Sequence, residues 1–417
     1  MIKDFLNPIY LISAQVVFYI ATVSKYNYVD NYTRVISIVV ISYLLFLALA
    51  FIIKTIYTGK KQSKKDLIMN KETYLLLNIL NIFTIFIIVV TIMKITGEYG
   101  GILGFIYNYN FNVIRDIQSS LGDLGSYALI LSYINPVVVT IIFEGVDKIK
   151  SKILKKLTKI LSYVNLIIIF LFSMVIGARI VFIYSIMTLL VVKFKNMKIN
   201  FKNIKYVIIG IVVLIFFTLY SQNIRNRNME ESQIANISPI EMVSNYYDKS
   251  IENSVYVITN QDNKATAEGY WTLKPLFTLP KHGPIFSEIY TNYIADTLIK
   301  SRDDEFLYVS SLGLDPVYNT MGIYGYQYLD WGIWSIFIIS IQYAISYFVF
   351  MRFKLNTKGA RILYPIIFIS FIDLLRTNGL SSSFITYYIV FYILLNVFDC
   401  VLTNYKYRKG MINGGNR

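Results

Sequence analysis

Long apolar runs separated by polar connections dominate the pattern along this chain. About 20 residues of helix are enough to cross the hydrocarbon core of a bilayer, and several of the runs reach that length. The pattern therefore predicts an all-α polytopic membrane protein with about ten transmembrane helices. The predicted helices cover residues 5–23, 35–57, 73–93, 126–144, 161–176, 179–192, 206–222, 327–350, 362–376 and 383–402.

The polar connections differ sharply in their basic content. Five of them, together with Lys3, hold 25 of the chain's 40 Lys and Arg residues. Short basic connections remain in the cytoplasm, so both termini are predicted to be cytoplasmic. The five basic connections are 59–71, 147–159, 193–205, 351–361 and 404–417. The segments predicted to face outward are 24–34, 94–125, 223–326 and 377–382.

One apolar stretch, from 161 to 192, contains an arginine at position 179. Because basic connections flank this stretch on both sides, it must cross the membrane an even number of times. We expect two short helices joined by a tight turn at "GAR", where Gly177 gives the backbone its freedom. Arg179 then lies at the extracytoplasmic rim. At the bilayer centre an arginine would cost about 2.5–3.5 kcal/mol on insertion scales.

The long outward segment differs in charge from the rest of the chain. From Asn223 to Gln327 it has 8 basic and 13 acidic residues, although the whole chain carries a net charge of +15. This asymmetry is typical of basic loops that face an anionic leaflet, and it argues against nucleic-acid binding. We expect four regions, namely membrane helices over 1–222, an extracytoplasmic loop domain of short helices over 223–326, membrane helices over 327–402, and a cytoplasmic tail over 403–417.

Tyrosine and tryptophan are frequent in and beside the outward segment. A tyrosine ring offers a flat apolar face and a hydroxyl group, which suits a sugar ring, although an aromatic belt at the membrane interface explains the same pattern. The candidate sugar-binding residues are Tyr270, Trp271, Tyr324 and Tyr328.

Few arginines are expected on the outward side, and four of them are candidate anion ligands, whereas Arg302, beside "DDE", is expected to form a local salt bridge. The planar guanidinium group binds phosphate through two parallel hydrogen bonds and keeps its charge. The alternative is an arginine that caps a helix or extends along its end toward water. Asp373 lies three residues before one of them, Arg376, and can orient it. The candidate pyrophosphate-binding residues are Arg179, Arg376, Arg225 and Arg227.

Three residues are candidate proton acceptors: His282, Glu288 and Asp330. A histidine titrates near neutral pH and can act as a general base, but His282 can equally be a surface residue. Asp330 is predicted in the first turn of a helix, where the helix dipole alone would stabilise a carboxylate by about 0.3–1 kcal/mol. No metal site is expected, because the sequence has no His/Cys cluster, and Cys400 is its single cysteine.

Three stretches of the sequence resemble a known family, the Wzy-type oligosaccharide repeat-unit polymerases of O-antigen and capsular polysaccharide assembly. "GARIVFIYSIMTLLVVKF" (177–194) is similar to the Gly-x-Arg turn that opens a short helix in the family. "DPVYNTMGIYGYQYLDWGIWSIFII" (315–339) resembles the stretch that enters a late helix. "DLLRTNG" (373–379) resembles the arginine-bearing outer end of the penultimate hairpin. Trp331 stands where the family usually has Phe, and Trp334 where it often has a small residue.

The resemblance implies a GT-C-like, metal-independent glycosyltransferase in the bacterial plasma (inner) membrane, with no cofactor. It would transfer a growing glycan from undecaprenyl pyrophosphate to a second lipid-linked repeat unit at the outer face. Arg179 and Arg376 would converge on the pyrophosphate, assisted by Arg225 or Arg227. Candidate partners are the lipid-linked donor and acceptor, a chain-length regulator and a flippase. Two alternatives stay open, an O-antigen ligase-type transferase and a lipid-linked oligosaccharide flippase or transporter.

Overall fold

The computed structural model describes residues 6–61, 69–109, 113, 116–117, 122–194, 239–260, 269–277, 320–377, 379–381 and 383–414. All regular elements in these ranges are helices. Seven of the helices are long and apolar enough to cross a membrane, which confirms the prediction of an all-α polytopic membrane protein. They are Pro8–Tyr26, Tyr32–Tyr57, Lys71–Glu98, Gly122–Lys148, Lys152–Val175, Gly322–Lys354 and Ile385–Tyr405.

These seven helices coincide with seven of the ten predicted segments. Two further segments correspond to shorter helices, α9 (Arg179–Phe194) and α18 (Lys358–Ile372). A helix of 16 residues, such as α9, is about 24 Å long, which is less than the hydrocarbon core of about 30 Å. Segment 206–222 lies outside the described residues, as does most of 223–326, so the number of ten spans and the extent of the loop domain stay predictions.

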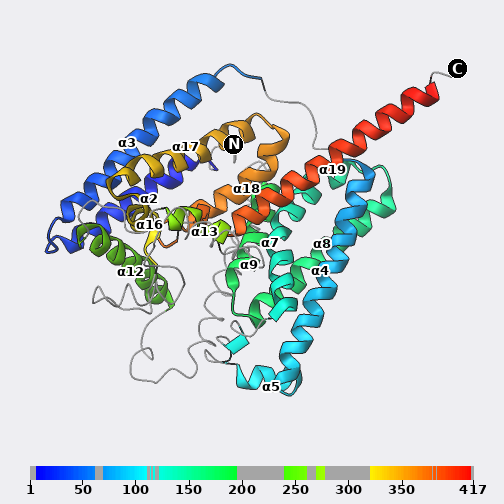
Figure 1. The fold of residues 1–417 in the computed structure, drawn as a ribbon, viewed down its shortest axis with the longest axis horizontal. Helices are drawn as coiled ribbons and strands as arrows, with labels where there is room; N and C mark the ends of the chain where they lie inside the picture. The colour runs from blue at the N-terminus through cyan, green and yellow to red at the C-terminus, as the bar shows by residue number, and fades with distance from the viewer. Residues whose placement is uncertain are drawn as a thin grey trace, which may run out of the picture. The chain divides into compact units, whose positions relative to one another are not determined.

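The chain forms two compact units. Unit 1 contains residues 1–2, 64–236 and 387–417, and unit 2 contains residues 3–63 and 237–386. Each unit therefore combines segments that are far apart in the sequence. Figure 1 shows the course of the chain.

Unit 1 is a bundle in which α4 packs against α7 and α8, and α9 packs against α7 and α8. Pro136 lies inside α7. The helices of unit 1 are α4 (Lys71–Glu98), α5 (Gly101–Asn108), α7 (Gly122–Gly145), α8 (Lys152–Val175), α9 and the greater part of α19 (Ser383–Gly414). Because α19 continues to Gly414, most of the predicted tail is helical.

The turn between α8 and α9 has the predicted form. Helix α8 ends at Val175, α9 begins at Arg179, and Gly177 between them has a φ of +65°. The two helices fold back on each other, since the rings of Phe170 and Phe182 lie 5.0 Å apart across the turn. The prediction of two helices joined at "GAR" is therefore confirmed.

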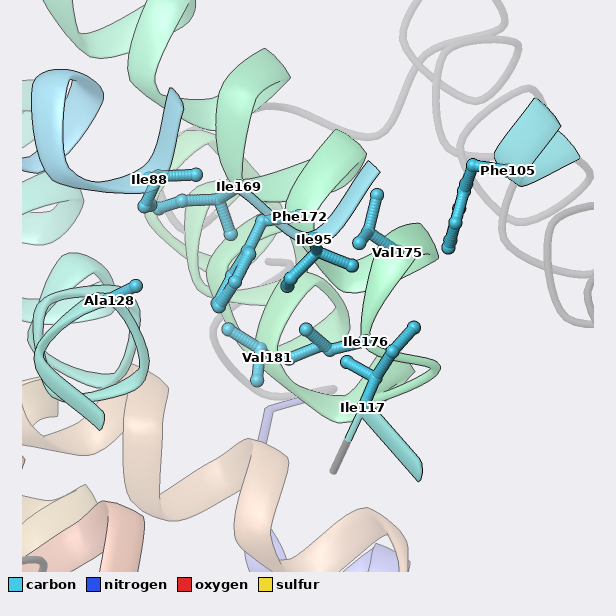
Figure 2. Close-up of a cluster of buried hydrophobic side chains, with 10 residues drawn as sticks. All are labelled: Ile88, Ile95, Phe105, Ile117, Ala128, Ile169, Phe172, Val175, Ile176 and Val181. Carbon is cyan, nitrogen blue, oxygen red and sulfur yellow. The ribbon is translucent and has the colours of Figure 1, made fainter. Parts of the chain in front are cut away.

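A cluster of buried apolar side chains surrounds this turn (Figure 2). Ile176 precedes Gly177, Val181 lies in the first turn of α9, and both belong to the cluster together with Ile95 and Phe172. In a bundle surrounded by lipid, such side chains contribute mainly through van der Waals packing between the helices. Packing of this kind fixes the backbone at which Arg179 begins α9.

Unit 2 is built around α3 and α17, which pack along one another with α2 beside both (Figure 1). Helix α2 begins at Pro8, where proline is favoured, and the side chain of Asn7 caps its first turn. Helix α12 packs against α16, and α13 also contacts α16. The helices of unit 2 are α2 (Pro8–Val23), α3 (Tyr32–Tyr57), α12 (Pro239–Asn260), α13 (Tyr270–Phe277), α16 (Gly322–Trp331), α17 (Ser335–Lys354) and α18.

The predicted helix 327–350 starts earlier than expected and is interrupted. Helix α16 begins at Gly322 and ends at Trp331. Gly332, which has a φ of +53°, interrupts the α-helix, and α17 begins at Ser335. Asp330 therefore lies at the end of α16. The prediction that it occupies the first turn of a helix is wrong, because the helical backbone starts eight residues before it.

Candidate functional site

A tight turn at the end of α18 positions the guanidinium group of Arg376. The Nε atom of Arg376 lies 3.2 and 3.0 Å from the two carboxylate oxygens of Asp373, and its Nη2 atom lies 2.6 Å from Oδ2. The backbone N–H groups of Arg376 and Thr377 both donate to the carbonyl of Asp373. The turn and the ion pair therefore hold the arginine in one orientation.

Asp373 is itself held from helix α12. The hydroxyl group of Tyr247 donates to Oδ1 of Asp373 at 2.9 Å, and the hydroxyl of Thr377 lies 3.4 Å from Oδ2. Burial, and next the negative charge of Asp373, raise the pKa of Tyr247 well above its usual value. Tyr247 therefore keeps its proton and remains a donor at neutral pH.

The backbone of the turn is fixed by two further elements. The N–H groups of Gly322 and Ile323, at the start of α16, donate to the carbonyls of Arg376 and Leu374 at 3.1 and 2.9 Å. Gly322 has a φ of +58°, and a Cβ atom there would lie 2.4 Å from the carbonyl oxygen of Leu375. Only glycine combines this conformation with so close an approach.

Helix α2 also contacts this turn. The Nε2 atom of Gln15 donates to the carbonyls of Phe371 and Ile372 at 2.7 and 3.0 Å. These carbonyls belong to the last turn of α18 and lack partners within that helix. The turn that carries Arg376 is thus tied to α2, α12 and α16, all within unit 2.

The free edge of the Arg376 guanidinium group can bind an anion. Asp373 occupies the edge formed by Nε and Nη2, whereas Nη1 forms no hydrogen bond with any residue in the described ranges. The side chain is 32% exposed. Burial lowers the pKa of Arg376, but the carboxylate of Asp373 raises it more, so the group stays cationic. The second edge suits a phosphate oxygen pair.

Asp330 serves as a cap for helix α13. Its carboxylate, which is fully buried, accepts hydrogen bonds from the backbone N–H groups of Trp271 and Thr272 at 2.9 and 2.5 Å, and from the Thr272 hydroxyl at 2.6 Å. A carboxylate is favourable at a helix N-terminus. The expected dipole interaction therefore exists, but with α13 and not with the helix that contains Asp330. A role as proton acceptor stays a prediction.

The four aromatic residues predicted to bind sugar are all buried. Tyr324 and Tyr328 are fully buried, and Tyr270 and Trp271 are nearly so. The ring of Tyr324 lies 4.7 Å from that of Tyr19, and its hydroxyl lies 3.2 Å from that of Tyr343. In this conformation the rings pack against protein, and their role in sugar binding stays a prediction.

The described part of the chain does not bring the remaining predicted site residues together. Arg179 begins α9, but its side chain lies outside the described part, as do Arg225, Arg227, His282 and Glu288. Arg179 belongs to unit 1 and Arg376 to unit 2. Their convergence on one anionic group stays a prediction.

Sequence analysis missed a polar seam inside unit 1. The Nδ2 atom of Asn165 on α8 donates to the Oδ1 atoms of Asn81 on α4 and Asn135 on α7, at 2.7 and 3.1 Å. Asn135 in turn donates to Ser185 on α9 at 3.1 Å. The signal was an asparagine in each of three apolar segments. Such bonds between helices stabilise bundles in lipid, where no water competes for the amides.

Among the described residues no group of His, Cys, Asp and Glu side chains could hold a metal ion. The sequence matches no family model, and no match was found among the curated proteins or the solved structures. The apolar helices define an α-helical membrane protein, and the turn at Arg376 gives it a partly exposed, oriented cation.

Proposed function

We propose that this protein is a membrane glycosyltransferase that polymerises undecaprenyl-pyrophosphate-linked oligosaccharide repeat units into O-antigen or capsular polysaccharide. It acts at the outer face of the bacterial plasma membrane, with ten transmembrane helices, a large extracytoplasmic loop domain and both termini in the cytoplasm. The observation that supports the proposal is the orientation of Arg376, whose Nη1 atom forms no hydrogen bond within the described part of the chain and can bind an anion.

The main requirement of the proposed reaction is a fixed positive charge beside the leaving pyrophosphate. The acceptor hydroxyl oxygen attacks the anomeric carbon of the donor sugar, the bond from that carbon to the phosphate oxygen breaks, and undecaprenyl pyrophosphate leaves. Negative charge grows on the departing phosphate oxygen, and an oriented arginine stabilises it. Arg376 and Arg179 are the proposed pyrophosphate ligands. His282, Glu288 or Asp330 accepts the proton of the hydroxyl group.

The test is a reaction with purified components. The protein in detergent or liposomes is mixed with lipid-linked repeat units extracted from a strain that lacks polymerase, and the products are separated by size. A ladder of polymers with release of undecaprenyl pyrophosphate is expected. Transfer only to another type of acceptor would identify a ligase. Movement of the lipid-linked glycan between leaflets, with no new glycosidic bond, would identify a transporter.

The proposed orientation has a separate test. A periplasmic reporter enzyme fused after Ser250, in α12, is expected to be active, and one fused after Lys198 is expected to be inactive. Cytoplasmic reporters at the same two positions should give the reverse result. Activity of the periplasmic reporter at Lys198 would contradict the assignment of sides.

A further inference from the structure

A patch of aromatic and charged side chains lies where the connection between α2 and α3 meets α12. We call it the tyrosine patch, and it consists of Tyr26, Tyr28, Tyr256, Asp248 and Glu252. Tyr28 is 68% exposed, and its ring lies 6.2 Å from that of Tyr26 at an angle of 54°. Burial, and next a hydrogen bond with Tyr28, raise the pKa of Tyr256. Two angled rings and a third hydroxyl thus form one surface.

Charged groups are interleaved with these rings. Asp248, Glu252 and Tyr256 are spaced four residues apart on α12 and therefore share a face of the helix. Asp248 pairs with Lys25 at 3.1 Å, and Glu252 pairs with Lys249 at 2.6 Å. Burial, and next the negative charges of Glu252 and Asp248, raise the pKa of Tyr26. The rings are consequently held among groups that both donate and accept hydrogen bonds.

This mixture fits a glycan better than it fits lipid chains. Acyl chains have no hydrogen-bond donors for the two carboxylates, and removing a carboxylate from water without such donors is costly. A sugar ring presents an apolar C–H face that packs on a tyrosine, and hydroxyl groups that donate to carboxylates and accept from ammonium groups. Binding sites for small molecules typically combine apolar surface with a few such polar groups.

The patch also lies on the helix that holds the aspartate partner of Arg376. Tyr247, which holds Asp373, directly precedes Asp248 on the same helix. With a rise of 1.5 Å per residue, Glu252 lies about 8 Å and Tyr256 about 14 Å along α12 from Tyr247. With 3.6 residues per turn, the side chains of the patch point about 100–180° around α12 from Tyr247, so an oligosaccharide attached to a phosphate at Arg376 must extend around the helix as well as along it.

We propose that the tyrosine patch binds the oligosaccharide of a lipid-linked repeat unit while Arg376 binds its pyrophosphate. The inference rests on the proposed function and adds to it the place where the glycan is held. Tyr28 provides the stacking face, and the carboxylates of Asp248 and Glu252 accept the sugar hydroxyl groups.

The test measures glycan binding without catalysis. The probe is the free oligosaccharide released by mild acid from the lipid-linked repeat units of the native strain, and its binding to the purified full-length protein is followed by saturation-transfer NMR. Tyr28→Ala should weaken binding roughly two- to tenfold, the range that corresponds to about 0.5–1.5 kcal/mol for an aromatic contact. Glu252→Gln should weaken it as well.

Matched variants separate this inference from the proposed function. Tyr10→Ala is the control, because Tyr10 is 62% exposed on α2 and lies outside the patch; it should leave binding unchanged. Arg376→Ala should keep oligosaccharide binding but abolish polymerisation. If Tyr28→Ala binds the oligosaccharide as tightly as the unmodified protein, or if Tyr10→Ala loses as much affinity as Tyr28→Ala, the proposal that the patch binds the glycan is wrong. The polymerase proposal is unaffected by either result. Oligosaccharide binding without any polymerisation by the unmodified protein would overturn the polymerase proposal alone.

Discussion

Arg376 and Asp373 form a two-point ion pair, with Nη2 of the arginine 2.6 Å from Oδ2 of the aspartate. The residues are three positions apart and share one turn, so the pair requires no distant part of the chain. Tyr247 adds the tertiary constraint, because its hydrogen bond fixes the aspartate against α12. The pair therefore orients the arginine, and among the described residues none forms a hydrogen bond with its Nη1 atom.

Arg376→Ala should abolish polymer formation while leaving single lipid-linked repeat units made and exported. Arg376→Lys should also fail, because an ammonium group cannot pair with Asp373 and a phosphate through two separate edges. Polymer length is measured on gels from complemented deletion strains, with membrane levels of each variant checked. Arg352→Ala, on the predicted cytoplasmic side, is the matched control. Normal ladders from Arg376→Ala would remove this residue from the site.

Tyr247→Phe should reduce the rate of polymerisation without abolishing it. The substitution keeps the ring and removes one hydrogen bond to Asp373, a loss of about 0.5–1.5 kcal/mol. The rate at saturating lipid-linked substrate should fall by less than in Arg376→Ala, and the thermal midpoint should decrease slightly. Tyr405→Phe, at an exposed tyrosine of α19, serves as the control. An unchanged rate would mean that Asp373 needs no support from α12.

Gly322→Ala should destabilise unit 2 and reduce activity. The substitution strains a backbone with φ of +58° and places a Cβ atom 2.4 Å from the carbonyl of Leu375, so a loss of about 2 kcal/mol or more is expected. Gly59→Ala is the control, since Gly59 has a φ of +79° but no atom near its Cβ position. Its cost should be about 1 kcal/mol, the backbone term alone. Equal midpoints in thermal unfolding would contradict the proposed contact.

Asn165→Leu should destabilise the bundle of unit 1 by about 1–2 kcal/mol. The change removes two hydrogen bonds, to Asn81 and Asn135, and leaves their carbonyl oxygens without this donor in an apolar interior. Unfolding in increasing SDS is the suitable measurement. Ile167→Leu, on the exposed face of the same helix, should have little effect. Equal stability of the two variants would show that the seam contributes nothing to the bundle.

Asp330→Asn distinguishes a cap from a catalytic base. The amide keeps the size of the carboxylate but accepts fewer hydrogen bonds from the start of α13. The free energy of unfolding should therefore fall by about 1–3 kcal/mol. If Asp330 is only a cap, the polymerisation rate at low temperature should remain near that of the unmodified protein. A rate loss of a hundredfold or more with unchanged thermal unfolding would instead make Asp330 the proton acceptor.

The apolar pattern predicted the membrane class and most of the helices, because burial in lipid is decided by composition over some 20 consecutive residues. The turn at Gly177 was also predictable, since two basic connections enforce an even number of crossings. The pairing of Arg376 with Asp373 followed from their spacing alone. Each of these features depends on residues that are close together in the sequence.

Tertiary structure decided which polar groups meet. Asp330 was predicted to lie in the first turn of its own helix. Its carboxylate instead caps α13, whose first residues lie almost 60 positions earlier in the sequence. Tyr324 was predicted to bind sugar, but it is buried against Tyr19 of α2 and Tyr343 of α17, whereas Tyr28 is exposed. The physical reason is the same in each case. A buried polar or aromatic side chain interacts with whichever partner the packing of the helices brings close. That partner often comes from a distant segment, so the sequence around the side chain does not predict it.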